Sequence, residues 1–303
     1  MRRTAPHPWI NATIQELAHF GRALGALGCV PGNGGDVSVL IPPDVSSSLA
    51  TKESIFVRFT DLDQLRALRG DARPYYRAQG TTFSNLDLPL DRLVGRMILT
   101  TTSGAKMWDL DRAPQRHFCI ITVQEKGFHL HATAQQPVPT TEVINHLIGH
   151  ALNTVAENTS STVLHAHPQH SIDLSRHPAA GTCDDFNYQV YTQRVEQLAN
   201  VPELLGFVPF ALPGSTTLAT ATASAFVRHR VVIWQAHGVI VREQSMERCV
   251  DLVQYTEASA AAALRCLTAG ELRRPSRDEI ALFLSMYELP EDFLQLLDRR
   301  ERP

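Results

Sequence analysis

Two apolar, strand-like runs in this chain carry histidines near the place where each strand would end. The first run, T-V-L-H-A-H-P, contains His165 and His167, and the second, V-V-I-W-Q-A-H-G-V-I-V, contains His237. Residues two apart on a strand project from the same face, so His165 and His167 would lie side by side. Buried imidazoles need polar partners, and this requirement constrains how the two runs are placed in the fold.

Three neutral imidazoles that converge on one point can hold a divalent transition metal. A site with three protein ligands leaves one position open for a substrate, which is the arrangement of a catalytic rather than a structural metal. The alternative is that His165 and His167 are hydrogen-bonded core residues. Taken alone, this pair leaves both interpretations open, because a chain with 13 histidines contains some close pairs by chance.

Glu142 stands at the start of an expected helix in V-P-T-T-E-V-I-N, where Thr140 and Thr141 can cap the first turn. An acidic residue at this place complements the helix dipole, which is a common structural role. Near a metal, the same carboxylate could act as a general base. The spacing of the sequence does not decide between the two roles.

Two glycine-containing segments could place backbone amides around an anion. They are P-G-N-G-G-D-V-S-V, which begins at Pro31, and T-T-T-S-G-A-K, which ends at Lys106. Glycine permits the backbone conformations in which successive amides face a phosphate. Ordinary tight turns use the same residues, so the segments also fit a purely structural role.

The order of the expected elements predicts a mixed α/β fold. Apolar residues recur at helical spacing from Ile10 to Leu27, and Gly28 would end that helix. A strand is expected from Val37 to Ile41, and a hairpin with its turn at Glu125–Gly127. Later strands alternate with helices, so we expect a mixed sheet with helices on both faces.

We expect one domain over residues 1–303. Its irregular stretch at about 42–92 is interpreted as a possible insertion, and residues 271–303 as a C-terminal helical extension. The net charge of −3 argues against nucleic acid or a membrane surface as the partner, and leaves a small molecule. The five cysteines are scattered without a C-x-x-C, which favours a reducing compartment, and we expect a cytoplasmic location.

Taken in order, these motifs resemble the class II aldolase/adducin family, and within it the L-rhamnulose-1-phosphate aldolase branch. The segments that carry the resemblance are G-N-G-G-D-V-S-V, V-P-T-T-E, V-L-H-A-H-P, F-A-L-P-G-S and V-I-W-Q-A-H-G-V, within about residues 9–270. The resemblance implies a three-layer α/β/α sandwich with a mixed, largely antiparallel central sheet. It also implies a homotetramer with active sites between subunits.

The resemblance also implies a role for each site residue. One Zn²⁺ per subunit would be bound by His165, His167 and His237, with Glu142 as the general base. Glu196 would donate a carboxylate to the neighbouring subunit's site. The residues implied to hold the substrate phosphate are Asn33, Gly35, Ser103, Gly104, Thr140 and Thr141.

Asp36 departs from the family pattern, which has Asn at this position. A carboxylate beside a phosphate dianion costs roughly 1 kcal/mol or more at short range in partly solvated surroundings. Either Asp36 points away from the substrate, or the substrate carries less negative charge there. The S-G-A-K loop is also spaced differently from the S-G-K of that branch.

The resemblance implies a zinc-dependent class II aldolase that cleaves a ketose 1-phosphate, or a related ketose, to dihydroxyacetone phosphate and an aldehyde. A sugar-phosphate epimerase or a dehydratase would use the same metal scaffold and is the main alternative. A non-catalytic adducin-like scaffold domain is disfavoured, because the three histidines and Glu142 are present. An unrelated H-x-H oxygenase is disfavoured by the accompanying P-T-T-E and H-G-V motifs.

Overall fold

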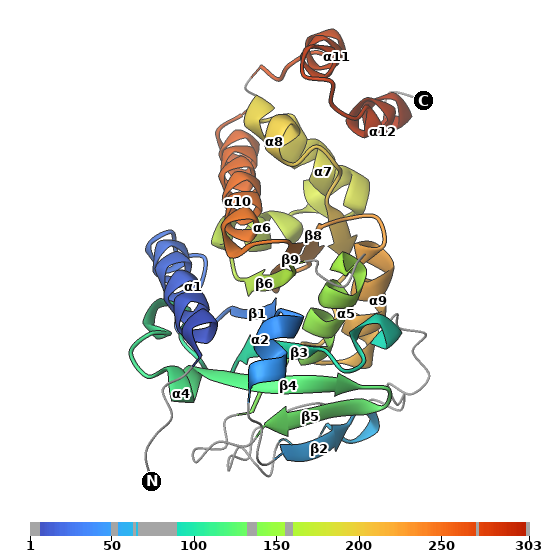
Figure 1. Cartoon of the computed structure of the whole chain (residues 1–303). Helices are drawn as coiled ribbons and strands as arrows, with labels where there is room; N and C mark the ends of the chain where they lie inside the picture. Colours follow the sequence, from blue (N-terminus) through green and yellow to red (C-terminus); the bar gives the residue numbers. More distant parts are fainter. Residues whose placement is uncertain are drawn as a thin grey trace.

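The structure, a computed structural model, describes residues 7–49, 54–62, 65, 90–131, 138–154, 160–270 and 273–300. Within these residues, nine strands form one sheet in the order β2-β5-β4-β3-β1-β6-β9-β8-β7 (Figure 1). The strands are β1 Asp36–Leu40, β2 Ser54–Arg58, β3 Met97–Thr101, β4 Phe118–Gln124, β5 Gly127–His131, β6 Thr162–Ala166, β7 Gly206–Val208, β8 Val231–Trp234 and β9 Gly238–Glu243. Neighbouring strands are antiparallel except β7 and β8, so the predicted mixed, largely antiparallel sheet is confirmed.

Helices cover both faces of this sheet. The α-helices are α1 Pro8–Ala26, α2 Pro43–Ser48, α4 Pro114–His117, α5 Val143–Asn153, α6 Gln169–Ser175, α7 Cys183–Tyr191, α8 Val195–Asn200, α9 Thr216–Phe226, α10 Met246–Ala269, α11 Arg277–Met286 and α12 Asp292–Arg300. The 3₁₀ turns are η1 Phe59–Asp61, η3 Leu90–Leu93, η4 Met107–Asp109 and η5 Pro178–Ala180.

One core lies under α1, α6, α7 and α10, and the other under α5 and α9. The alternation along β6 shows the division, because Leu164 belongs to the first core and Val163 to the second. The three-layer sandwich is therefore confirmed.

The expected local elements are confirmed where the structure describes them. α1 ends before Gly28, which has a φ of +72° and donates its amide to the Gly25 carbonyl. β4 and β5 form the expected hairpin, with Gln124 paired to Gly127. α5 begins at Val143, one residue later than the sequence pattern suggested, because Glu142 occupies the N-cap position.

The register of three strands sets the position of the functional side chains. Asp36 of β1 is the Cα partner of His165 in β6. On its other side, β6 pairs with β9, and β9 turns back into β8 through the pair Trp234 and Gly238. The end of β6, the start of β1 and the β8–β9 turn therefore meet at one end of the central strands.

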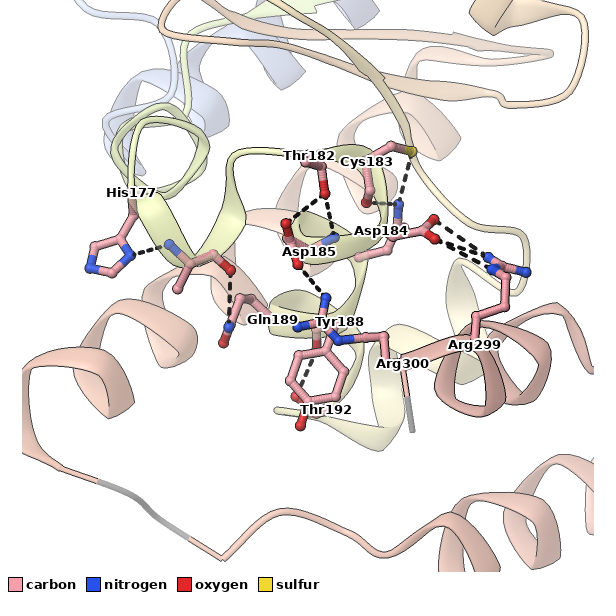
Figure 2. A network of polar contacts seen from close by, with 12 residues as sticks. His177, Thr182, Cys183, Asp184, Asp185, Tyr188, Gln189, Thr192, Arg299 and Arg300 are labelled. Atoms are coloured by element: carbon pink, nitrogen blue, oxygen red, sulfur yellow. Dashed lines mark hydrogen bonds and ion pairs between the residues drawn. The ribbon is translucent and has the colours of Figure 1, made fainter. Parts of the chain in front are cut away.

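The C-terminal helix α12 packs on α7 through one buried aromatic contact and two partly exposed ion pairs, and Figure 2 shows the ion pairs. Phe293 of α12 is 1% exposed and stacks on Tyr191, with ring centroids 5.3 Å apart. Arg299 pairs with Asp184, and Arg300 lies over the ring of Tyr188. Exposed ion pairs contribute little to stability, so the aromatic burial carries most of this contact.

The prediction of one domain with an insertion and an extension is untested and stays a prediction. Residues 50–53, 63–64 and 66–89 of the expected insertion lie outside the described residues, as do residues 271–272 and 301–303 of the extension. Within the described part of the chain, no helix combines the length and the apolar character that a membrane span requires.

Candidate metal centre and active site

The structure brings His165, His167 and His237 together at the end of the central strands described above. One possible ligand atom from each residue lies within 4.8 Å of the other two. The Nε2 atoms of His165 and His167 are 2.9 Å apart. The ring centroids of His165 and His237 are 4.9 Å apart. The H-x-H spacing thus places two side chains together, and the β8–β9 turn adds the third.

A strained turn presents His237 to the other two histidines. The His237 amide donates to the Trp234 carbonyl at 3.0 Å, and Ala236 adopts a φ of +60°, which is unusual for a residue other than glycine. Ser175 of α6 holds this turn, because its hydroxyl accepts the Ala236 amide at 2.9 Å.

Two glycines that the sequence analysis did not single out allow the histidines to approach. A Cβ at Gly238 would lie 2.4 Å from the Ala166 carbonyl oxygen and 2.9 Å from the His165 ring. A Cβ at Gly34 would lie 2.5 Å from Nδ1 of His167. Gly238 follows a histidine in H-G-V and Gly34 lies in the N-G-G-D turn, and these were the available signals, but glycine is too common in turns for them to be decisive.

Burial keeps the three imidazoles neutral. It lowers the pKa of His237 to about 4 and that of His165 well below the ordinary value, and the other imidazoles of the cluster act in the same direction. Burial also lowers the pKa of His167, although the charge of Asp36 opposes it. The neutral form is the one that binds a metal.

The hydrogen bonds of the cluster fit a metal ion. His165 donates its Nδ1 hydrogen to the Val239 carbonyl at 3.0 Å, which leaves Nε2 with a lone pair directed at Nε2 of His167. Such second partners fix the orientation of metal-binding histidines. Nδ1 of His237 is buried and has no hydrogen-bond partner among the described residues. Two neutral nitrogens at 2.9 Å and one orphaned nitrogen are what a divalent cation would satisfy.

Glu142 is a buried carboxyl at the N-cap of α5. Its Oε2 accepts the Asn145 side-chain amide at 2.7 Å, and its Oε1 accepts the Gly214 backbone amide at 3.0 Å. Burial and the negative charge of Asp36 raise the pKa of Glu142 to about 8, although these two hydrogen bonds oppose the shift. A carboxyl with this pKa can both take up and return a proton near neutral pH.

Asp36 is turned toward protein donors. The Thr140 hydroxyl donates to Oδ2 at 2.6 Å, and Nε2 of His146 lies 2.5 Å from Oδ1. Burial alone would raise the pKa of Asp36, but the His146 imidazole and the Thr140 hydroxyl hold it well below the usual range. Asp36 is therefore a carboxylate with a defined partner on each oxygen.

The residues expected to hold phosphate come from three separate loops. The isolated bridge between Thr102 and Pro139 joins the Ser103 loop to the P-T-T-E segment, and Gly104 has a φ of +83°. Gly35 is buried, and a Cβ there would lie 3.0 Å from the His165 carbonyl oxygen. Asn33 is exposed in the loop before β1, and Thr141 is half-buried. Their binding role stays a prediction.

Glu196 is exposed on α8, which packs chiefly against α7, α10 and α11. No described contact brings it to the histidines of the same chain. Its expected role in a neighbouring subunit stays a prediction.

A cavity of about 600 Å³, lined by residues that include Trp9, Arg96 and Ser161, lies at the opposite ends of β1 and β6, so it does not contain the histidine cluster.

Comparison with known proteins identifies the family. The family model described as Class II Aldolase and Adducin N-terminal domain matches residues 77–264. The chain belongs to this family. The match includes the three histidines and Glu142.

Curated relatives and solved structures agree with this assignment. The chain is 23% identical to a rhamnulose-1-phosphate aldolase of Listeria monocytogenes over 88% of its own length and 89% of that protein. It is 25% identical to a rhamnulose-1-phosphate aldolase of Yersinia pestis over 74% of its length and 84% of that protein. A sugar-phosphate aldolase from Thermotoga maritima has the same fold, with a TM-score of 0.62 and 20% identity over 87% of this chain and 98% of that one. The likeness to the rhamnulose-1-phosphate aldolases confirms the branch that the motifs resemble.

Proposed function

We propose that this member of the class II aldolase family is a zinc-dependent lyase. It cleaves a ketose 1-phosphate of the rhamnulose 1-phosphate type to dihydroxyacetone phosphate and an aldehyde. The observation that carries the proposal is the convergence of three neutral imidazoles, those of His165, His167 and His237, at one end of the central strands. Asp36 and Glu142 lie at the same end. The likeness to rhamnulose-1-phosphate aldolases supports the choice of substrate.

The three histidines would hold Zn²⁺, which when bound supplies Lewis-acid stabilisation of the negative charge that develops on the ketose oxygens. The protein's own groups move the proton. The C4 hydroxyl of the ketose loses its proton as the C3–C4 bond breaks and the aldehyde leaves, and this proton balances the one that C3 gains. Glu142 in its acid form gives the proton to C3, and in the synthetic direction it removes the same proton. Burial and the two hydrogen bonds from Asn145 and Gly214 keep this carboxyl in place.

The loops beside the cluster would hold the phosphate. Their hydroxyls and amides suit an anion, and the proposed set is Asn33, Gly35, Ser103, Gly104, Thr140 and Thr141. Thr140 already donates its hydroxyl to Asp36, so its contribution there includes fixing that carboxylate. Glu196 would complete the site of an adjacent subunit in a homotetramer. The free, scattered cysteines support the cytoplasm as the proposed location.

A coupled assay tests the proposal. Zinc-loaded protein is given L-rhamnulose 1-phosphate, and the release of dihydroxyacetone phosphate is followed by its enzymatic reduction. We expect release that disappears in His165→Ala. No release from protein that retains zinc would reject this substrate. An epimer formed without any triose phosphate would identify the protein as an epimerase instead, and loss of water would identify a dehydratase.

A further inference from the structure

A continuous row of polar side chains, buried except at its far end, runs between the central strands and α5, from the three histidines toward the opposite ends of β1 and β6. We call it the histidine–serine chain, and its members are Asp36, His146, Ser38, His150, Ser161 and Asn153, with Arg242 at its far end. Ser38 and His150 are fully buried, and His146 and Ser161 are 1% exposed. Water therefore has almost no access to the middle of the row. His146 and His150 are four residues apart on α5, so they lie on one face of that helix.

The far end of the chain has a fixed direction. Nη1 of Arg242 donates to Oδ1 of Asn153 at 2.9 Å, so the amide nitrogen of Asn153 faces away from Arg242. That nitrogen donates to the Glu243 carbonyl at 3.0 Å and to Oγ of Ser161 at 3.1 Å. Because Ser161 accepts this hydrogen bond, its own hydrogen is available for Nδ1 of His150, which lies 2.7 Å away.

The same direction continues through both imidazoles. Burial lowers the pKa of His150 well below the ordinary value, so the ring is neutral and carries one hydrogen. With Nδ1 accepting from Ser161, that hydrogen is on Nε2 and points to Oγ of Ser38 at 2.7 Å. A neutral His146 would accept the Ser38 hydrogen at Nδ1, 2.7 Å away, and carry its own hydrogen on Nε2, 2.5 Å from Asp36. In this arrangement every hydrogen of the chain points toward the carboxylate.

We propose that the histidine–serine chain is a set of positioning residues, which holds Asp36 as an oriented carboxylate beside His165 and thereby raises the affinity of the three-histidine cluster for a divalent cation. A positive guanidinium at one end and a carboxylate at the other polarise each hydrogen bond in the same sense, and aligned bonds strengthen one another. Outer partners of this kind tune metal sites through the groups that they hold.

Asp36 is placed to act on the cation. It is the strand partner of His165, and residues directly opposite each other on neighbouring antiparallel strands project from the same face of the sheet. The inference rests on the proposed function only in that the cluster binds a divalent cation. It requires no particular sugar and no aldolase activity.

The first test reads the hydrogens directly in metal-free protein. ¹⁵N NMR of histidine-labelled protein distinguishes the two neutral tautomers of an imidazole. We expect the Nε2–H form for both His146 and His150, each assigned by its loss in the His→Gln variant. An Nδ1–H tautomer or an imidazolium at either histidine would overturn the proposed direction.

The sharpest variant is Asn153→Asp, which replaces the donor at the far end by an acceptor and retains a charged partner for Arg242. Ser161 would then donate to the carboxylate, and His150 should change to the Nδ1–H tautomer. Asn200→Asp makes the same chemical change on α8, outside the chain, and should leave the histidine signals as they are. An unchanged His150 signal in folded Asn153→Asp would refute the chain.

Zinc affinity, measured by competition with a chelator, gives the functional outcome. We expect Asn153→Asp to weaken zinc binding about 10-fold, as outer-shell changes do. This loss would be diagnostic, because an added negative charge alone would strengthen cation binding. Ser161→Ala should weaken binding in the same way, while Ser161→Thr, which keeps the hydroxyl, should restore it. Equal affinities for the Ala and Thr variants would contradict the positioning role.

These measurements separate this inference from the proposed function. Tautomers and zinc affinity are read without any substrate. Protein that binds zinc, responds to Asn153→Asp and lacks aldolase activity would reject the proposed function and support the chain. Aldolase activity with zinc affinity and tautomers unaffected by Asn153→Asp would do the reverse.

Discussion

The candidate metal centre and the proposed phosphate corner lie next to each other but are built in different ways. The three histidines come from a strand end and a tight hairpin turn, so the register of β6, β8 and β9 fixes them. The phosphate corner, composed of Asn33, Gly35, Ser103, Gly104, Thr140 and Thr141, comes from three loops. Because strand side chains alternate with a period of two, the placement of the paired histidines can be predicted from the sequence. The placement of the loop residues depends on loop geometry, which the sequence pattern does not give.

The largest expected effect on the histidine cluster comes from a change at His237. His237→Ala removes one of the three proposed ligands, and we expect zinc affinity to fall by more than about 100-fold, because changes to outer partners alone cost about 10–100-fold. Aldolase activity should fall to background. Chelator competition measures the affinity, and His19→Ala, at an exposed position on α1, is the matched control. Zinc binding equal to that of the unmodified protein would show that His237 is not a ligand.

Glu142→Gln tests whether the neighbour of the cluster does chemistry or only caps a helix. The amide keeps the size of the side chain but cannot carry the proton, so kcat should fall by roughly 10²- to 10⁴-fold. Zinc affinity should stay unchanged, which separates this variant from His237→Ala. Glu247→Gln, exposed in the first turn of α10, is the control for loss of a helix-start carboxylate. An unaltered kcat in Glu142→Gln would exclude the role of base.

The contrast between strand and loop also explains what the sequence could and could not predict. The H-x-H pattern predicted that His165 and His167 lie side by side, because sheet geometry is regular, and the resemblance to the family added His237. The partner of Asp36 was not predictable in this way. His146 lies on α5, 110 residues further along the chain, and only the packing of α5 on β1 brings it to Asp36.

His150 and Ser38 were missed for the same physical reason. A buried histidine in an apolar helix has no distinctive spacing with respect to a serine on a strand. The i, i+4 pair of histidines on α5 was visible, but it predicts only a shared helix face. The fold class was predictable because it needs only element order and apolar patterning, and these survive errors in single residues.

The protonation of Glu142 gives a pH-dependent distinction between the two parts of the site. Its pKa is about 8 in the folded protein, compared with an ordinary value of 4.5 for a glutamate carboxyl. Between these values the native state holds a proton that the unfolded chain has lost, so stability falls as pH rises from about 5 to 8. The slope is at most about 1.4 kcal/mol per pH unit for one group.

Urea unfolding of metal-free protein at several pH values measures this dependence. The difference in stability between the unmodified protein and Glu142→Gln should shift against the unmodified protein as pH rises, and should level off above pH 8. Thr141→Val, which leaves every ionisable group in place, should show the same pH dependence as the unmodified protein. A constant difference between the unmodified protein and Glu142→Gln would mean that the pKa of Glu142 is not raised.

The smallest expected effect lies in the phosphate corner. Thr141→Val keeps the shape of the side chain and removes one hydroxyl, and a hydrogen bond to a charged group contributes about 1.5–3 kcal/mol. KM for a ketose 1-phosphate should therefore rise by roughly 10- to 150-fold, while kcat and zinc affinity stay the same. The same variant should leave the KM for the unphosphorylated ketose unaltered, and Thr268→Val, exposed near the end of α10, should change neither constant. A rise in KM for both ketoses would show that Thr141 supports the sugar or the loop, and the phosphate would then have to be held elsewhere, at a greater distance from Asp36.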